Sequence, residues 1–148
     1  GDYDAIVLAE AGLRRLELTD RIAQVIPRDQ MLPAVGQGAL GIETRTSDER
    51  TRALLAPLND AITHAAVLAE RAMLRGLRGG CLAPVGAWGR IAGARLTLDG
   101  VVLSGDGQTR VFATLSGSPG DAETLGTAVA EALLSQGAAS LITDARAS

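Results

Sequence analysis

The sequence predicts an α/β remnant at its start, followed by an α+β domain in which a three-stranded antiparallel sheet is covered by helices. Three observations lead to this prediction. The chain opens on a short apolar run and a helix-like segment, as in a mostly parallel sheet. Its middle carries a long helical pattern that stops at two glycines. Its latter part has short apolar runs separated by Asp-Gly pairs, then returns to helical periodicity.

Composition excludes several classes of function. The 148 residues are 47% hydrophobic and 21% charged, as in a soluble globular protein. The net charge of −3 argues against a general nucleic-acid binder, and every positive side chain is arginine, so no lysine nucleophile exists here. One cysteine and one histidine, His64, give no basis for a disulfide or a metal site. No run approaches the roughly 20 apolar residues of a bilayer span, and no signal-like start is visible, so a cytoplasmic location is expected.

The first part of the chain reads as strand, helix and strand. Residues 3–9 form an apolar run short enough for a buried strand, residues 10–18 have helical character, and residues 22–26 alternate weakly. A core strand at this point would lack its sheet neighbours. We therefore expect the chain to begin within a domain.

The next segment is rich in glycine. Gly36-Gln37-Gly38 permits close approach of the backbone to a ligand or a neighbouring strand, and residues 39–44 should be extended. A dinucleotide-binding fingerprint is the weaker interpretation, because strand-like residues rather than a helix follow these glycines. Ser47 is expected to cap a helix that runs to about residue 58.

A long helix is predicted over residues 61–77, with Asn59 or Asp60 as its cap and Gly79 and Gly80 closing it in the left-handed conformation. Its apolar residues recur at intervals of three and four, which suits one buried face. They are Ile62, Ala65, Ala66, Ala69, Met73 and Leu77.

The only cysteine, Cys81, follows this helix and should lie on a loop. Arg71, Arg75 and Arg78 bring positive charge close to it in sequence, which favours the nucleophilic thiolate. A lone cysteine is also often a small buried hydrophobe. Spacing alone leaves both interpretations open.

The last part predicts strands and a covering helix. Apolar runs at 88–91, 94–98, 101–104 and 110–115 are separated in the later part by Asp99-Gly100 and Asp106-Gly107, which are hairpin signals. A helix is expected over residues 121–135, and Gly137 should end it. Its apolar positions are Leu125, Val129, Leu133 and Leu134.

Three motifs in the same order resemble one family. The stretch LRGGCLAPVG around Cys81 resembles the cofactor-attachment loop of the porphobilinogen deaminases, also called hydroxymethylbilane synthases. LPAVGQGALGIE, at residues 32–43, resembles the family's return segment between domains, and YDAIVLAEAGLRRL, at residues 3–16, resembles the preceding strand and helix. The resemblance covers nearly all of this chain but only the latter half of the family's.

The resemblance implies a division of the chain and an activity. Residues 1–32 correspond to the end of a second, periplasmic-binding-protein-like domain, residues 33–58 to the segment returning to the first domain, and residues 59–148 to the third. The family is a transferase that condenses four porphobilinogen molecules, with loss of ammonia, in tetrapyrrole and haem biosynthesis. Its catalytic aspartate belongs to the missing N-terminal half, so no catalytic residue is expected here and this fragment alone should be inactive.

Five site residues follow from the resemblance. Cys81 corresponds to the residue that forms a thioether to the dipyrromethane cofactor, and a thiolate suits the soft electrophilic carbon that porphobilinogen presents after losing ammonia. Arg15 is expected to contact carboxylates of cofactor and substrate, and Arg71 is a second substrate contact. Gln37 and Gly38 correspond to cofactor-facing residues. On local grounds Arg15 could instead be solvated, Arg71 could be a salt-bridge partner, and Gln37-Gly38 could be only a tight crossing.

Two other functions remain open on the sequence. The chain could be a non-catalytic α+β binding or interaction module in which Cys81 is a structural residue. It could also be the ligand-binding half of a periplasmic-type receptor, against which the lack of a visible signal sequence weighs. Under the favoured interpretation, its partners are porphobilinogen and the missing N-terminal half, with no nucleic acid or membrane.

Overall fold

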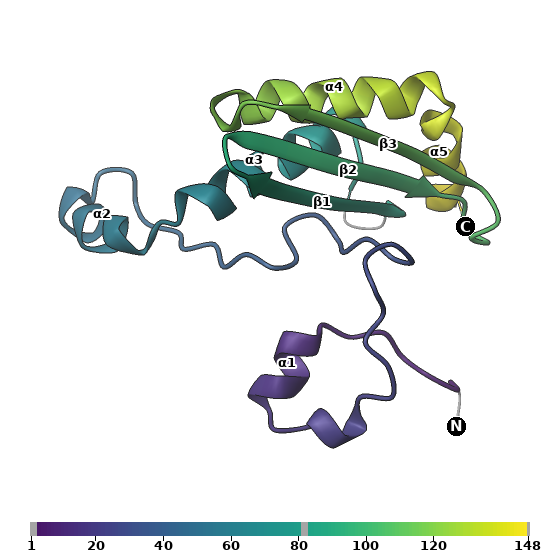
Figure 1. The fold of residues 1–148 in the computed structure, drawn as a ribbon, viewed down its shortest axis with the longest axis horizontal. Helices are drawn as coiled ribbons and strands as arrows, with labels where there is room; N and C mark the ends of the chain where they lie inside the picture. The colour runs from purple at the N-terminus through teal and green to yellow at the C-terminus, as the bar shows by residue number, and fades with distance from the viewer. Residues whose placement is uncertain (1–2, 81–82, 148) are drawn as a thin grey trace. The chain divides into compact units, whose positions relative to one another are not determined.

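The computed structural model of the chain describes residues 3–80 and 83–147. It divides into two compact units, Gly1–Met31 and Leu32–Ser148, and each is described by itself. Figure 1 draws the ribbon of both units.

The first unit has little regular structure. It contains helix α1 (Glu10–Arg15) and a 3₁₀ turn, η1 (Thr19–Arg21). Between residues 3 and 31 no strand forms and no residue is buried, so the strands predicted over 3–9 and 22–26 are wrong for this structure. The reason is that a strand needs a neighbour for its backbone N–H and C=O groups, and none of the described residues supplies one.

The second unit holds the sheet and its helices. In chain order its elements are α2 (Glu49–Leu55), η2 (Ala56–Leu58), α3 (Ala61–Gly76), β1 (Val85–Ala92), β2 (Arg95–Leu103), β3 (Arg110–Gly117), η3 (Pro119–Asp121), α4 (Ala122–Ser135) and α5 (Ala138–Ala147).

Helix α2 is capped one residue later than predicted. The carboxylate of Asp48, not the hydroxyl of Ser47, accepts hydrogen bonds from the Thr51 backbone N–H (3.0 Å) and the Thr51 hydroxyl (2.8 Å). A carboxylate cap also carries negative charge at the positive end of the helix dipole. The α-helix then gives way at Leu55 to η2, which contains Pro57.

The three strands form an antiparallel sheet in the order β1-β2-β3, which confirms the predicted sheet. The turn between β1 and β2 lies at Gly93, with φ +60°, and the turn after β2 contains Gly107, with φ +71°. The Asp106-Gly107 hairpin signal is therefore confirmed. The Asp99-Gly100 signal is wrong, because both residues lie within β2.

Burial explains why Asp99-Gly100 is strand and not turn. A Cβ on Gly100 would lie 2.5 Å from the sulfur of Met73, in α3, and 3.1 Å from a methyl group of Leu133, in α4. Glycine at this point lets both helices press against the same face of the sheet (Figure 1). Asp99, its neighbour, faces the other side.

Helices α3 and α4 also pack closely against each other. A Cβ on Gly126 would lie 2.2 Å from the carbonyl oxygen of Ala69, and one on Gly76 would lie 2.7 Å from Cβ of Ala130. The core lies between these helices and the sheet. Its buried residues include Ala69, Met73, Ala87, Leu96, Leu98, Val102, Val129, Leu133 and Ile142.

Two predictions about the helices need correction. Ile62 and Leu134 were placed on buried faces, but their exposed fractions are 58% and 37%. Helix α5 was not predicted, although Gly137 (φ +95°) ends α4 as expected. The short α5 is rich in alanine and buries Ala138 and Ile142.

A helix that spans a membrane needs both sufficient length and high hydropathy. No single helix among the described residues reaches both, although the bent pair Pro119–Ser135 and Ala138–Arg146 does so when taken together.

Candidate functional site

Helix α3 leads into the segment that contains Cys81. The Asp60 carboxylate caps it by accepting from the Thr63 N–H (2.7 Å), as predicted. At the other end the left-handed residue is Arg78 (φ +51°) and not a glycine. Space at Gly79 is limited, since a Cβ there would lie 2.6 Å from a methyl group of Leu74, whose side chain would have to move.

Cys81 and Leu82 lie outside the described residues, so the role expected of Cys81 stays a prediction. The residues on either side are joined, because the Ala83 N–H donates to the Gly80 carbonyl (3.0 Å). The carbonyl of Arg78 accepts a hydrogen bond from the Arg146 guanidinium. The end of α3 is therefore attached to α5.

Three arginines lie on α3 and just past its end. Arg71 and Arg75, four residues apart, lie on one side of α3, and Arg78 follows the end of the helix at Gly76. Arg75 is paired with the carboxylate of Glu123 (2.7 Å). Arg71 and Arg78 are exposed and make no ion pair with residues 3–80 or 83–147. Among the described residues, the guanidinium groups of Arg71 and Arg78 thus have no carboxylate partner.

Arg15 ends α1, in the first unit. Its neighbour Arg14 binds the carboxylate of Glu10, four residues earlier, at 2.6 Å. Arg15 is exposed and makes no ion pair within the described part of the chain. Of the two arginines, Arg15 is thus the one with a guanidinium left for a ligand.

Gln37 and Gly38 lie in a tight turn over residues 35–38. The Gln37 N–H donates to the Ala34 carbonyl (3.0 Å), and the Ala39 N–H donates to the Gly36 carbonyl (3.1 Å). Gly36 has φ +71°, a conformation that side-chain-bearing residues rarely adopt. Gln37 and Gly38 themselves are exposed.

The segment before this turn runs along the start of β1. The Ala87 N–H donates to the Pro33 carbonyl (2.9 Å), and a Cβ on Gly86 would lie 3.0 Å from Cβ of Leu32. Strand β1 begins at Val85, four residues after Cys81. The turn and the cysteine segment are therefore connected to the same strand.

Glu70 joins the turn to α3 and β1. Its side chain is buried, with one carboxylate oxygen accepting from the Gly36 N–H and the other from the Gly89 N–H, both at 2.7 Å. Burial raises the pKa of Glu70 above its usual value, and the two amide hydrogen bonds oppose that shift without cancelling it.

Glu70 is not among the site residues predicted from the sequence. A signal was present in its position. Ala66, Glu70, Met73 and Leu77 follow one another at intervals of four, three and four, which is the spacing of the buried face. A carboxylate in that stripe must be buried, so it must also be hydrogen-bonded.

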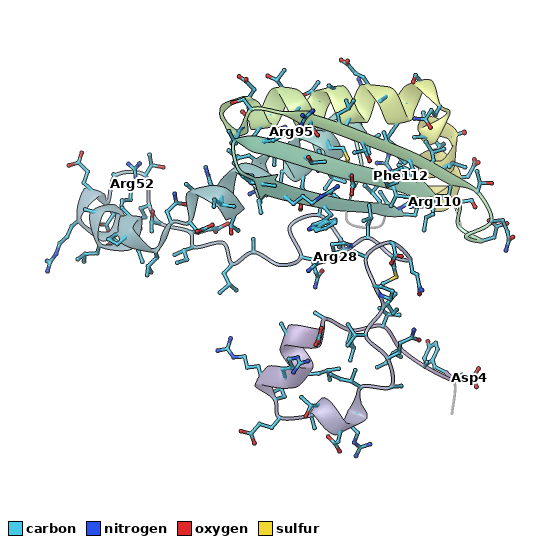
Figure 2. All side chains as sticks on the ribbon, in the orientation of Figure 1. Asp4, Arg28, Arg52, Arg95, Arg110 and Phe112 are labelled. Carbon is cyan, nitrogen blue, oxygen red and sulfur yellow. The ribbon has the colours of Figure 1, made fainter. Side chains whose placement is uncertain are left out.

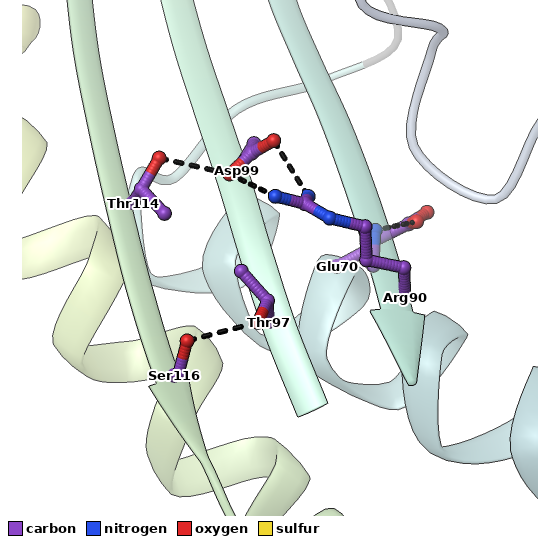
Figure 3. Close-up of polar contacts among 7 residues, drawn as sticks. Glu70, Arg90, Thr97, Asp99, Thr114 and Ser116 are labelled. Atoms are coloured by element: carbon purple, nitrogen blue, oxygen red, sulfur yellow. Dashed lines mark hydrogen bonds and ion pairs between the residues drawn. The ribbon is translucent and has the colours of Figure 1, made fainter. Parts of the chain in front are cut away.

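The other face of the sheet carries a second polar network, drawn in Figure 3. The Arg90 guanidinium donates to both carboxylate oxygens of Asp99 (2.6 and 3.3 Å), and the Thr114 hydroxyl donates to one of them (2.8 Å). Arg90 also lies 4.3 Å from the centre of the Trp88 ring. These groups satisfy one another, which identifies the network as structural support for the sheet.

The same face continues along β3. Figure 2 labels Arg110 and Phe112, and the Arg110 guanidinium lies 4.8 Å from the centre of the Phe112 ring. Among the described residues no group of three or more His, Cys, Asp or Glu side chains could hold a metal ion.

Two family models match the chain. One is described as "Porphobilinogen deaminase, dipyromethane cofactor binding domain" and matches residues 1–53. The other is described as "Porphobilinogen deaminase, C-terminal domain" and matches residues 64–135. The Gly36–Gly38 turn falls within the first match, and Glu70 and Cys81 fall within the second.

Curated relatives agree with these matches. The porphobilinogen deaminases of two strains of Acidithiobacillus ferrooxidans are each 53% identical to this chain over 146 residues. That alignment covers 99% of this chain and 47% of each relative. The chain thus spans about half the length of the curated relatives it matches.

Proposed function

Because the chain belongs to the porphobilinogen deaminase family, we propose that it supplies the cofactor-carrying part of a hydroxymethylbilane synthase. The complete enzyme would condense four porphobilinogen molecules head to tail, with loss of ammonia. The activity belongs to the complete protein, since this chain spans 47% of its relatives. Bilane formation by the 148-residue chain alone would contradict this division of roles.

The available cations fit the dipyrromethane cofactor named for this family. A porphobilinogen-derived group carries acetate and propionate side chains, which need cationic partners. The exposed guanidinium groups of Arg71 and Arg78, without carboxylate partners among the described residues, meet that need. When bound, the cofactor supplies the pyrrole carbon on which the product chain grows.

The chain's own residues would have distinct roles at this site. Cys81 provides the sulfur that holds the cofactor covalently, and the neighbouring arginines favour its thiolate form. Arg71 and Arg15 bind substrate carboxylates, and Arg15 also contacts the cofactor. Gln37 and Gly38 present a backbone turn toward the cofactor. The observation that carries the proposal is the arginine series Arg71, Arg75 and Arg78, which runs along α3 and past its end and directly precedes Gly79-Gly80-Cys81.

We propose that residues 1–32 end a second domain of periplasmic-binding-protein type, that residues 33–58 return to a first domain, and that residues 59–148 form the third. A cytoplasmic location also remains a proposal. It is supported by the single cysteine, which suits a reducing compartment.

The test of this function is the mass of the full-length protein. We expect an increase that corresponds to a covalent pyrrole group and maps to the Cys81 peptide, and we expect Cys81→Ser to lose both the increase and the activity. The serine variant should unfold at nearly the wild-type urea concentration. Active wild-type enzyme with an unmodified Cys81, together with a serine variant destabilised by about 1 kcal/mol or more, would identify a structural cysteine instead.

A further inference from the structure

The buried carboxylate of Glu70 has an unusual set of partners. Asp99, the other buried acid of the described residues, is neutralised by the Arg90 guanidinium. Glu70 has no cationic partner there and instead accepts two backbone N–H groups at 2.7 Å. These donors, Gly36 and Gly89, lie 34 residues before it and 19 residues after it.

Both donors are glycines in unusual surroundings: the backbone turns sharply at Gly36, and at Gly89 it comes very close to helix α3. Gly36 has φ +71°, and a Cβ on Gly89 would lie 2.9 Å from the carbonyl oxygen of Ala66 on α3. Glycine at both places allows the two N–H groups to reach one side chain.

The bonds from Gly89 and Ala87 also close the outer edge of β1. The Ala87 N–H points away from β2, because it donates to the Pro33 carbonyl. The Gly89 N–H points the same way, since the direction alternates along a strand. Glu70 therefore joins three segments: the turn at Gly36, the helix before Cys81 and the strand after it.

We propose that Glu70 is a positioning residue of the cofactor site, which holds the Gly36–Gly38 turn in a fixed register with α3 and β1. This inference rests on the proposed function, because the turn matters only if Gln37 and Gly38 face a group attached to Cys81. Two acceptor oxygens are required for two converging donors. Glutamine would present an NH₂ group to one of them and lose that hydrogen bond.

Among the described residues, no charged side chain on the elements packed against Glu70 pairs with its carboxylate, so its partners there are the two backbone amides. Residues 32–38 contain no titratable side chain. On β1, Arg90 points to the opposite face of the sheet and is bound by Asp99. On α3, Arg71 is exposed, and Arg75 is paired with Glu123.

The first experiment measures the amide resonances of the full-length protein labelled with ¹⁵N-glycine. We expect the Gly36 and Gly89 resonances to shift together with pH, at one midpoint higher than the ordinary glutamate value, because burial raises the pKa of Glu70. Glu70→Gln should abolish both shifts. Separate midpoints for the two resonances, or no shift of either in the wild type, would overturn the inference.

The second experiment measures cofactor loading and turnover in the full-length protein. We expect Glu70→Gln to lower kcat or loading by about tenfold to a hundredfold, the effect of misplacing a site by roughly 1 Å. Asp99→Asn is the control, since it alters the other buried acid, and its kcat should stay within about twofold of wild type. Wild-type kcat and loading in Glu70→Gln would overturn the inference.

A second pair of variants applies if Glu70→Gln fails to fold. Gly36→Ala strains the turn from its own backbone, and Gly93→Ala imposes similar strain at the β1–β2 turn, since both have positive φ and open space around them. We expect only Gly36→Ala to reduce loading or turnover. Equal effects of the two variants would overturn the inference, whereas wild-type enzyme without a pyrrole group on Cys81 would instead refute the proposed function.

Discussion

The two buried carboxylates of the described residues are stabilised by different means. Asp99 shares its charge with Arg90 and a hydroxyl, while Glu70 relies on two backbone amides. An ion pair is lost when either partner changes. The amide arrangement depends instead on how precisely two distant backbone segments are placed.

Asp99→Asn should destabilise the protein by about 1.5–3 kcal/mol, because it removes hydrogen bonds to a charged group from a nearly buried site. Glu123→Gln, which alters the exposed pair with Arg75, should cost less than about 1 kcal/mol. The free energy of unfolding in urea measures both. Equal losses would show that burial does not strengthen the Asp99 network.

Glu70 should make stability depend on pH with a defined sign. Its pKa is raised in the folded state by burial, so the folded protein binds the proton more tightly than the unfolded chain does. The stability from this proton is fully present below the unfolded value near 4.5 and is lost as pH rises through the folded pKa. Unfolding in urea across that range should show this loss, and Glu70→Gln should remove it.

Asp48 and Asp60 should affect the free energy of unfolding in a separate, more acidic pH range. Backbone N–H groups of Thr51 and Thr63 lower their pKa values from 3.8, so their contribution is present above that pH and is lost as pH falls further. A wild-type curve with no loss above pH 4.5, or an unchanged curve in Glu70→Gln, would contradict the assignment to Glu70.

Candidate side chains could be selected from the sequence where the residue type limits the chemistry, and the roles expected of them stay predictions. Cys81 and the arginines before it could be selected because thiolate and guanidinium chemistry depends on those residue types. Glu70 was missed, since its role depends on two glycine N–H groups that no local pattern brings together. Asp99 was read as part of a turn because local preference ignores the helices behind the strand.

At the scale of elements, the contact between α3 and α4 depends on very small residues. Gly126 on α4 faces the backbone of Ala69, and Gly76 faces Ala130. Side chains of ordinary size at these positions would push the helices apart. The helices were nonetheless predictable individually, because Asp60, Gly137 and the apolar stripes are local signals. Their close approach and the short α5 were not, since both depend on tertiary packing.

Gly126→Ala should destabilise the protein by about 1–3 kcal/mol, although alanine is the better helix former. The added methyl group would lie 2.2 Å from the Ala69 carbonyl oxygen, so the helices must separate. Glu131→Ala, on the exposed side of α4, is the control and should change stability by less than about 0.5 kcal/mol. Thermal or urea unfolding would show the difference, and a stabilised Gly126→Ala would contradict the close packing.

At the scale of the molecule, buried side chains are confined to one of the two units. All of the buried core residues lie between Ala65 and Ile142, whereas the described residues of Gly1–Met31 include none. The sequence pattern correctly identified an apolar run at residues 3–9. In the structure, however, Tyr3 in this run is 81% exposed. It could not show whether that run has a neighbouring strand, because pairing partners lie outside any local window.

Amide exchange of the 148-residue chain should therefore be uneven. We expect rapid exchange over residues 3–31 and strong protection in α3, α4 and the central strand β2, where burial and hydrogen bonding coincide. Adding the rest of the full-length protein should protect residues 3–9. Strong protection of that segment in the chain alone would mean that it pairs with another molecule.

The hydrogen bond between the Gly36 N–H and the Glu70 carboxylate also affects where related genes could be recombined. Its partner Gly36 belongs to the first family match, residues 1–53, and Glu70 belongs to the second, residues 64–135. A crossover between residues 53 and 64 would follow the family boundaries but would take the turn from one parent and the carboxylate from the other. A crossover before Leu32 would inherit both from a single parent, so chimeras joined there should keep the turn and its anchor matched.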